Sequence, residues 1–147
     1  MIELKKTEDI VLFKYLTNKY NPKGLKKAGD NPRYFVLTDN SDMWYVLILI
    51  DNADFRVIER FKKEYNVELN PWKCAFIRRI TTLPAFWGSE LPSLALKMLC
   101  EQLKSEGYEM VYSYSLPRHS GALYKHADFV RGWRTRSRMW FYYKLLK

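Results

Sequence analysis

The segment Trp44–Ile50 constrains the fold more than any other part of the chain, because its residues are apolar without alternation. A strand with one solvated face alternates apolar and polar residues, whereas a strand covered on both faces is apolar throughout. The sequence therefore predicts a central strand with helices packed on both faces of its sheet. The run Arg33–Leu37 precedes it, and the polar residues between the two runs predict a β-hairpin.

Strand-like and helical segments alternate along the rest of the chain. Further strands are expected at Ile2–Lys5, Cys74–Thr82, Met110–Leu116 and, as one extended finish, Trp133–Leu146. Helices are expected from a cap at Thr7 to Tyr20, from a cap at Ser89 to Gly107, and at Ser120–Ala127. Residues 51–72 fit either a short helix or a strand. This order predicts one α/β domain over residues 1–147 with a mixed central sheet.

Helical spacing and residue type identify the expected core. In the helix that begins near Ser89, the core-facing positions are Leu91, Leu94, Ala95, Met98, Leu99 and Leu103. The two cysteines, Cys74 and Cys100, have apolar neighbours and no metal-ligand spacing, so we expect buried thiols. With two histidines in 147 residues, we expect no metal site.

Charge and hydropathy indicate the class of partner. The 25 Lys and Arg residues exceed the 16 Asp and Glu residues, which gives a net charge of +9 and favours a polyanionic partner. The longest apolar run, Met43–Ile50, is far shorter than the roughly 20 residues of a membrane helix. The N-terminal residues Met1–Lys5 contain no apolar signal core. We therefore expect a soluble, cytoplasmic protein with no membrane partner.

The joint between the strand ending at Thr82 and the next helix is the first candidate site. Free N–H groups at the start of a helix bind anions, and Gly88 permits close approach of a ligand to the backbone. Ordinary turns between strands and helices have the same pattern, so the joint fits either an anion site or a simple connection.

The second candidate runs from Ser113 to Tyr124, where polar side chains follow the end of a strand. The carboxyl ends of strands are the usual location of sites in α/β proteins. His119 has the pKa range of a general base, and the Tyr124 hydroxyl is a possible general acid. A surface histidine and a packed tyrosine explain the same residues equally simply.

The third candidate is the C-terminal segment, which has no acidic residue after Asp128. Its basic residues Arg131, Arg134, Arg136, Arg138, Lys144 and Lys147 are interleaved with Trp133, Trp140, Phe141, Tyr142 and Tyr143. Arginines beside exposed aromatic rings bind nucleic acid, through phosphates and unstacked bases. A strand with aromatic residues in the core and arginines in solvent has the same alternation, and both interpretations stay open.

Residues 76–132 resemble the core of the GNAT superfamily of N-acyltransferases. The similarity lies in Thr82-Leu83-Pro84, a helix that leads to Gly107-Tyr108, the strand from Met110 to Ser115, and Leu123-Tyr124 followed by Phe129. Within that superfamily, the branch containing the phage Mom DNA-modification proteins has a similar pattern. The residues that match it are Arg79, Ser93, Ser113-Tyr114, His119-x-Gly121-x-x-Tyr124, Phe129 and Gly132.

The resemblance implies a GNAT-like fold and transfer of an acyl group from acetyl-CoA. It implies that the cofactor lies where two parallel strands separate, near Ile80, Thr81, Thr82 and Leu83, with its pyrophosphate at Gly88 and Ser89 and a hydroxyl from Ser93. The implied catalytic group comprises Tyr124 as the proton donor, with Ser113, His119 and Asp128 nearby. In the Mom branch the acceptor is the exocyclic amine of adenine in DNA, so the resemblance implies a phage or mobile-element protein in the host cytoplasm. Arg79, Arg131, Arg134, Arg136 and Arg138 are the residues expected to contact the DNA.

Two alternatives accompany this interpretation. The first is an N-acetyltransferase that acts on a protein or small-molecule amine. The second is a non-catalytic nucleic-acid-binding domain with a GNAT-like fold, which is favoured by Ala85 and Glu90 at positions where the superfamily has a basic and a small residue.

Overall fold

The apolar segment that begins at Trp44 forms an interior strand of a seven-stranded sheet, as predicted. We describe it from a computed structural model that covers residues 1–25, 29–39, 43–116 and 121–147. In β3 (Trp44–Asn52), every residue from Tyr45 to Asp51 is buried. Ile48 and its alternate neighbours pack on one face of the sheet, while Leu47 and Leu49 pack on the other.

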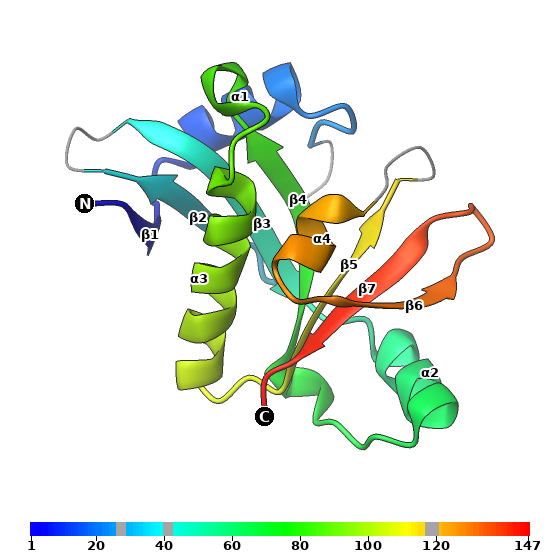
Figure 1. Ribbon diagram of the computed structural model, residues 1–147. Coiled ribbons are helices and arrows are strands. Elements are labelled where there is room, and N and C mark those ends of the chain that lie inside the picture. The colour runs from blue at the N-terminus through cyan, green and yellow to red at the C-terminus, as the bar shows by residue number, and fades with distance from the viewer. Residues whose placement is uncertain (26–28, 40–42, 117–120) are drawn as a thin grey trace.

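The strand order is β1-β2-β3-β4-β5-β7-β6 (Figure 1). The strands span Glu3–Lys6 (β1), Arg33–Thr38 (β2), Trp44–Asn52 (β3), Cys74–Thr82 (β4), Met110–Ser115 (β5), Val130–Arg134 (β6) and Trp140–Leu145 (β7). All neighbouring pairs are antiparallel except β4 and β5, which are parallel. The predicted mixed α/β sheet is thereby confirmed.

Helices cover both faces of this sheet. On one face lie α3 (Leu91–Ser105) and the short α4 (Ala122–His126), and their buried side chains belong to the largest core cluster. On the other face lie α1 (Ile10–Tyr20) and α2 (Phe55–Tyr65), each over a cluster of its own. Cys74 and Cys100 are buried free thiols as predicted, and burial raises the pKa of Cys100 to about 11. Within the described residues, no helix has the length and apolarity needed to cross a membrane.

The helix starts differ from the predicted caps. The Asp9 side chain, not Thr7, caps α1 by accepting a hydrogen bond from the Leu12 N–H. At α3 the cap position is Glu90, whose side chain accepts no bond from the helix, and Ser89 lies one residue earlier. The predicted core positions Ala95, Leu99 and Leu103 are buried, and Leu91 and Met98 pack against the same core. Leu94 was predicted wrongly, because it is 38% exposed, and Leu96 and Cys100 are buried in addition.

Two further segments differ from or complete the prediction. The ambiguous residues 51–72 contain α2, which begins at the Asp54 cap and ends at Asn66 in the left-handed conformation. The C-terminal stretch is a hairpin of β6 and β7, not one extended segment. Thr135 closes its turn, because its N–H donates to the Met139 carbonyl and its hydroxyl accepts from the Met139 N–H. Arg136 and Arg138 therefore lie in the turn, and the alternate spacing of Arg134, Arg136 and Arg138 does not place them on one face of a strand.

Candidate functional site

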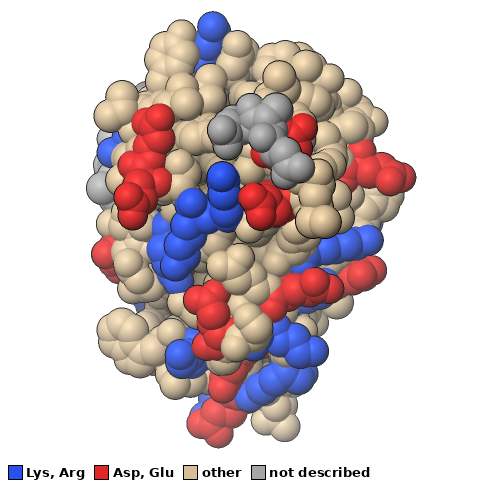
Figure 2. All heavy atoms as spheres, turned by 90° about the vertical axis from the view of Figure 1, so that its left-hand side faces the viewer, with Lys and Arg blue, Asp and Glu red and all other residues tan. Residues whose placement is uncertain are grey.

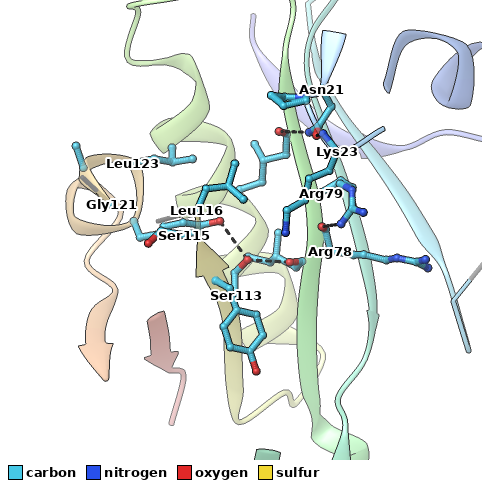
Figure 3. A pocket seen from close by; sticks show the side chains of 15 residues that line it. Asn21, Lys23, Arg78, Arg79, Ser113, Ser115, Leu116, Gly121 and Leu123 are labelled. Atoms are coloured by element: carbon cyan, nitrogen blue, oxygen red, sulfur yellow. Dashed lines mark hydrogen bonds between the residues drawn. The ribbon is translucent and has the colours of Figure 1, made fainter. Parts of the chain in front are cut away.

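The candidate site is the cleft formed where β4 and β5 separate. The two strands pair only where Cys74–Phe76 of β4 lies beside Met110–Tyr112 of β5. Beyond Phe76 and Tyr112 the strands diverge toward α4 (Figure 1). The resulting cleft has a volume of about 610 Å³, a size typical of small-molecule sites. Its walls come from Ile77–Ile80, Ser113–Leu116, Gly121–Tyr124 and Asn21–Lys23 (Figure 3).

Tyr124 is held rigidly in the wall contributed by α4. Its ring stacks on Tyr142 of β7 with a centroid distance of 5.2 Å and also contacts Phe129. Gly121 at the start of α4 has a φ of 75°, and a Cβ added there would overlap the Tyr142 side chain. Only glycine combines this backbone conformation with this close approach. Gly121 thus allows α4 to place Tyr124 at the cleft.

The Tyr124 hydroxyl is linked to both diverging strands. It lies 3.1 Å from the Ser113 Oγ of β5, and the Ser113 hydroxyl donates to the Ile77 carbonyl of β4 at 2.8 Å. Burial raises the pKa of Tyr124, while its hydrogen bond with Ser113 opposes the rise. The phenol therefore stays protonated at neutral pH and is able to donate a proton.

Ser115 presents an unsatisfied polar group to the same cleft. Its Oγ is buried and has no hydrogen-bond partner among the described residues. Buried hydroxyls are almost always paired, so an orphan at a cleft wall indicates a place for a ligand or water.

The open edge of β4 offers two backbone carbonyls beyond the last residue paired with β5. Since the Leu83 N–H donates to the Tyr45 carbonyl of β3, Ile80 and Thr82 direct their carbonyls to the opposite edge. The Ile80 carbonyl accepts from Asn21 Nδ2 at 3.0 Å, and the Thr82 carbonyl accepts from Trp87 Nε1 at 2.8 Å. Two side chains thus cover the edge along which an extended ligand would pair with β4.

The joint before α3 is a series of tight turns. The Ser89 N–H donates to the Phe86 carbonyl, and the Leu91 N–H donates to the Ser89 hydroxyl. The Ser93 hydroxyl donates to the Glu90 carbonyl. Gly88 has a φ of 79° and open space around the position of a Cβ, so its backbone is accessible. Gly88, Ser89 and Ser93 lie together at this joint, outside the lining of the cleft.

Three cations line the cleft, whereas no Asp or Glu among the described residues does. Arg78 is directed to the buried Asp51 carboxylate at 3.6 Å, which offsets its charge. Arg79 donates through Nε to the Gly24 carbonyl at 2.7 Å and through Nη1 to the Arg78 carbonyl, with no carboxylate partner among the described residues. Lys23 Nζ lies 3.7 Å from Met139 Sδ of the β6–β7 turn. The cleft therefore has excess positive charge.

Comparison with known proteins identifies a viral relative. The chain is 35% identical over 135 residues to uncharacterized protein 154 of Sulfolobus islandicus rod-shaped virus 1, covering 86% of this chain and 82% of the viral protein. The chain belongs to the family of that viral protein. No protein-family profile matches the sequence.

Solved structures of acetyltransferases share the fold of this chain. The ribosomal-protein-S18-alanine N-acetyltransferase of Escherichia coli superposes with a TM-score of 0.66 at 14% identity, over 97% of this chain and 91% of that one. The aminoglycoside acetyltransferase AAC(6')-Ib, solved with coenzyme A, gives a TM-score of 0.70 at 13% identity over 99% and 95% of the two chains. The spermidine/spermine N-acetyltransferase SpeG of Vibrio cholerae gives 0.69 at 15% identity over 99% and 95%. The chain thus has the GNAT fold that the resemblance implied.

The structure brings together only part of the predicted cofactor and catalytic set. Ile80, Ser113 and Tyr124 line the cleft, whereas Asp128 is exposed and lies outside its lining. Thr81 is buried, and its hydroxyl accepts a hydrogen bond from Asn21 Nδ2. Thr82 is the last residue of β4 and Leu83 is the next residue, and neither belongs to the lining of the cleft. His119 lies outside the described residues.

The predicted nucleic-acid contacts divide between the cleft and the hairpin. Arg79 lines the cleft, while Arg131, Arg134, Arg136 and Arg138 are exposed on β6 and its turn. The Arg131 guanidinium stacks over Trp140 at 4.3 Å, and Arg134 lies 5.7 Å from the same ring. The other aromatic residues of this hairpin contribute to packing, since Phe141 and Tyr142 are buried and Trp133 stacks on Phe141.

Four residues of the site were not singled out from the sequence, although Trp87 and Ser115 lie within the first and second candidate segments. Asn21 and Lys23 reach the cleft from the segment after α1, and Asn21 is about 60 positions away from the β4 residues that it bonds. What sets Ser115 apart is its lack of a hydrogen-bond partner, and what sets Trp87 apart is its bond to the Thr82 carbonyl. Both features belong to the folded structure and leave no signal in the sequence. The sequence predicted that the first helix ends at Tyr20, but nothing local indicated that the residues after it meet β4.

Proposed function

We propose that residues 1–147 form an acyl-CoA-dependent N-acyltransferase, with acetyl-CoA as the acyl donor. One observation carries the proposal: a protonated, buried Tyr124 hydroxyl joined through Ser113 to Ile77 where β4 and β5 separate. A proton donor at a cleft wall is what departure of a thiolate requires. The GNAT fold shared with acetyltransferases of known structure supports the same activity.

Several described residues fit an acyl-CoA substrate. Acetyl-CoA would supply the acyl group as a reactive thioester. Ile80 and Thr82 would pair with the pantetheine arm once Asn21 and Trp87 withdraw from their carbonyls, and the Ser115 hydroxyl would gain its missing partner. The accessible Gly88 backbone and the Ser93 hydroxyl are the groups at the start of α3 that would meet the pyrophosphate.

The chemical step assigns one proton to Tyr124. The acceptor nitrogen forms a bond to the thioester carbon as the carbon–sulfur bond breaks, and the Tyr124 hydroxyl donates its proton to the departing sulfur. The nitrogen loses one proton to solvent, and a solvent proton restores Tyr124. The products are an amide and free coenzyme A. Ser113 holds the Tyr124 hydroxyl in place for this transfer.

For the acceptor we propose an amine in nucleic acid, with the exocyclic amine of adenine in DNA as the first choice. The net charge of +9 and the exposed Arg131, Arg134, Arg136 and Arg138 support a polyanionic partner. The viral relative supports an origin in a virus or mobile element, and hence action in the cytoplasm of a host cell. A Mom-like DNA modification is the specific reaction that fits these features.

The alternative acceptors are amines of proteins or small molecules, because the three acetyltransferases above act on a ribosomal protein, aminoglycosides or polyamines. Aminoglycosides and polyamines carry several positive charges. A cleft with Lys23, Arg78 and Arg79 and no described carboxylate repels such substrates, so a protein amine is the stronger alternative.

A second candidate function is that of a non-catalytic nucleic-acid-binding domain. It is favoured because side chains of the protein itself cover the free edge of β4. Asn21 and Trp87 occupy the Ile80 and Thr82 carbonyls, and the Glu90 carboxylate lies at the start of α3, where it repels a pyrophosphate. Calorimetry separates the two functions. A domain that has lost the enzyme's cofactor site does not bind coenzyme A at millimolar concentration.

The activity test is incubation of the protein with acetyl-CoA and single- or double-stranded DNA. Free thiol released from acetyl-CoA reports acyl transfer, and mass spectrometry of the digested nucleosides reports an acetylated adenine. Release of coenzyme A with unmodified DNA would report hydrolysis of the thioester and reject the DNA acceptor. A parallel incubation with protein lysates then tests the alternative.

A further inference from the structure

The net positive charge of the chain comes from two segments. Residues 10–29 and 129–147 contain 11 of the 25 Lys and Arg residues and none of the 16 Asp and Glu residues. The remainder of the chain therefore has more acidic than basic residues. Figure 2 shows the left-hand side of the molecule as seen in Figure 1, and on that face basic and acidic side chains are interspersed.

The two basic segments meet at the cleft. Lys23, in the first segment, lies against Met139, which belongs to the turn of the second. Lys23 also lines the cleft beside Arg79 (Figure 3). The two segments that give the protein its net positive charge are therefore in direct contact beside the candidate active site.

Lys23 and Arg79 approach the cleft from the face of the sheet opposite Tyr124. Tyr124, Ile77 and Ile80 belong to the core cluster under α3, whereas Arg79 reaches the Gly24 carbonyl in the segment that follows α1. The cleft is consequently lined from both faces of the sheet, with the proton donor on one side and the two cations on the other.

Neither cation has a carboxylate partner within the described chain. The ion pairs there include Arg78 with Asp51 but neither Lys23 nor Arg79. Burial and the neighbouring Arg79 lower the pKa of Lys23, and burial and Arg78 lower the pKa of Arg79. Crowded cations without a counter-charge are unfavourable, and an anion between them would relieve the repulsion.

We propose that Lys23 and Arg79 form a subsite for a phosphate group carried by the acyl acceptor. The subsite rests on the proposed function, because it assigns the cation side of the cleft to the acceptor and the Tyr124 side to the acyl donor. The phosphate belongs either to a free nucleotide or to the backbone of a nucleic-acid strand that continues toward the β6–β7 turn.

Binding measurements test this subsite without requiring turnover. Isothermal titration in a chloride buffer compares 2′-deoxyadenosine 5′-monophosphate, 2′-deoxyadenosine and inorganic phosphate. We expect the nucleotide to bind about tenfold or more tightly than the nucleoside, the scale of a charge-assisted hydrogen bond. Lys23→Gln removes that advantage, Lys23→Arg keeps it, and Lys14→Gln, which removes an exposed charge from α1, leaves it unchanged.

Further measurements show whether the phosphate group belongs to a free nucleotide or to a strand, and which results overturn the proposal. The competitor is an oligonucleotide without terminal phosphates. If it competes with the nucleotide and binds Lys23→Gln more weakly than wild type, the subsite binds the backbone phosphate of a strand. If it does not compete, the subsite binds a free nucleotide. The proposal is overturned if neither inorganic phosphate nor the nucleotide binds wild type more tightly than Lys23→Gln. It is also overturned if Lys23→Gln weakens coenzyme A instead, because the cations would then serve the acyl donor. Absence of acetyl transfer with intact nucleotide binding would reject only the proposed enzyme activity.

Discussion

The Tyr124 hydroxyl lies 3.1 Å from the Ser113 Oγ, and through Ser113 it is connected to the β4 backbone at Ile77. This contact joins α4, β5 and β4 at the point where the two parallel strands separate. It holds the buried phenol at the cleft wall, in the position from which the proposed function requires Tyr124 to donate a proton.

Removal of this hydroxyl is the first prediction. Tyr124→Phe should lower the turnover rate by about 10²-fold or more, since a positioned proton donor contributes on that scale. The loss of one hydrogen bond should reduce the free energy of unfolding by only about 1 kcal/mol. Steady-state kinetics and urea unfolding measure the two effects. Tyr142→Phe is the matched control, because it removes a neighbouring tyrosine hydroxyl and should retain the parental rate.

The pH dependence of Tyr124 follows from its raised pKa, which burial causes. Its ionisation should occur above the ordinary value of about 10. The folded state then holds this proton more firmly than the unfolded state. Its contribution to stability is complete below about pH 10 and is lost as the pH rises through the folded pKa. Ultraviolet titration of tyrosinate, wild type minus Tyr124→Phe, measures the value. A difference signal centred below pH 9.5 would contradict the assignment.

Gly121 tests how α4 is positioned. Gly121→Ala adds a Cβ that meets Tyr142 and a side chain to a residue with a positive φ, so it should reduce both thermal stability and turnover. Gly107→Ala is the control, since Gly107 has a φ of 88° but open space around it. The control should show only the backbone cost of about 1 kcal/mol. Equal losses in the two variants would mean that the contact with Tyr142 has no effect.

Most of the fold could be predicted from the sequence, because its elements carry local signals. Trp44–Ile50 has the apolar pattern of a strand buried on both faces, and this strand and Cys74–Thr82 both lie where predicted. The final hairpin was missed because Trp133–Leu146 is aromatic and basic throughout, and its turn depends on Thr135 and on Arg138 in a left-handed conformation. Aromatic residues suit strands so well that they conceal the break between β6 and β7.

The site was less predictable than the fold, because its residues come from distant segments. The motif around Ser113 and Tyr124 is local, and both residues do line the cleft. Asn21 and Lys23 are near β4 only because α1 packs on the sheet and returns the chain to it. Such contacts depend on tertiary packing, which no local pattern encodes.

The hairpin arginines give a prediction for nucleic-acid binding. Replacement of Arg134, Arg136 and Arg138 by Ala should flatten the log-log salt dependence of DNA binding by about two to three units, at roughly 0.7 to 0.9 per phosphate contact. Fluorescence anisotropy across a range of salt concentrations measures the slope. Lys63, Lys97 and Lys104, which are exposed on α2 and α3, supply a triple-Ala control of equal charge. The same slope in both triple variants would remove the hairpin from the interface.

The central claim is that the cleft between β4 and β5 binds acyl-CoA, and backbone NMR of the protein titrated with coenzyme A tests it most directly. We predict saturable chemical-shift changes concentrated at Ile77–Thr82, Ser113–Ser115 and α4, together with loss of the Asn21 side-chain bond to Ile80. The absence of shift changes at millimolar coenzyme A, or changes confined to a surface away from these segments, would contradict the claim.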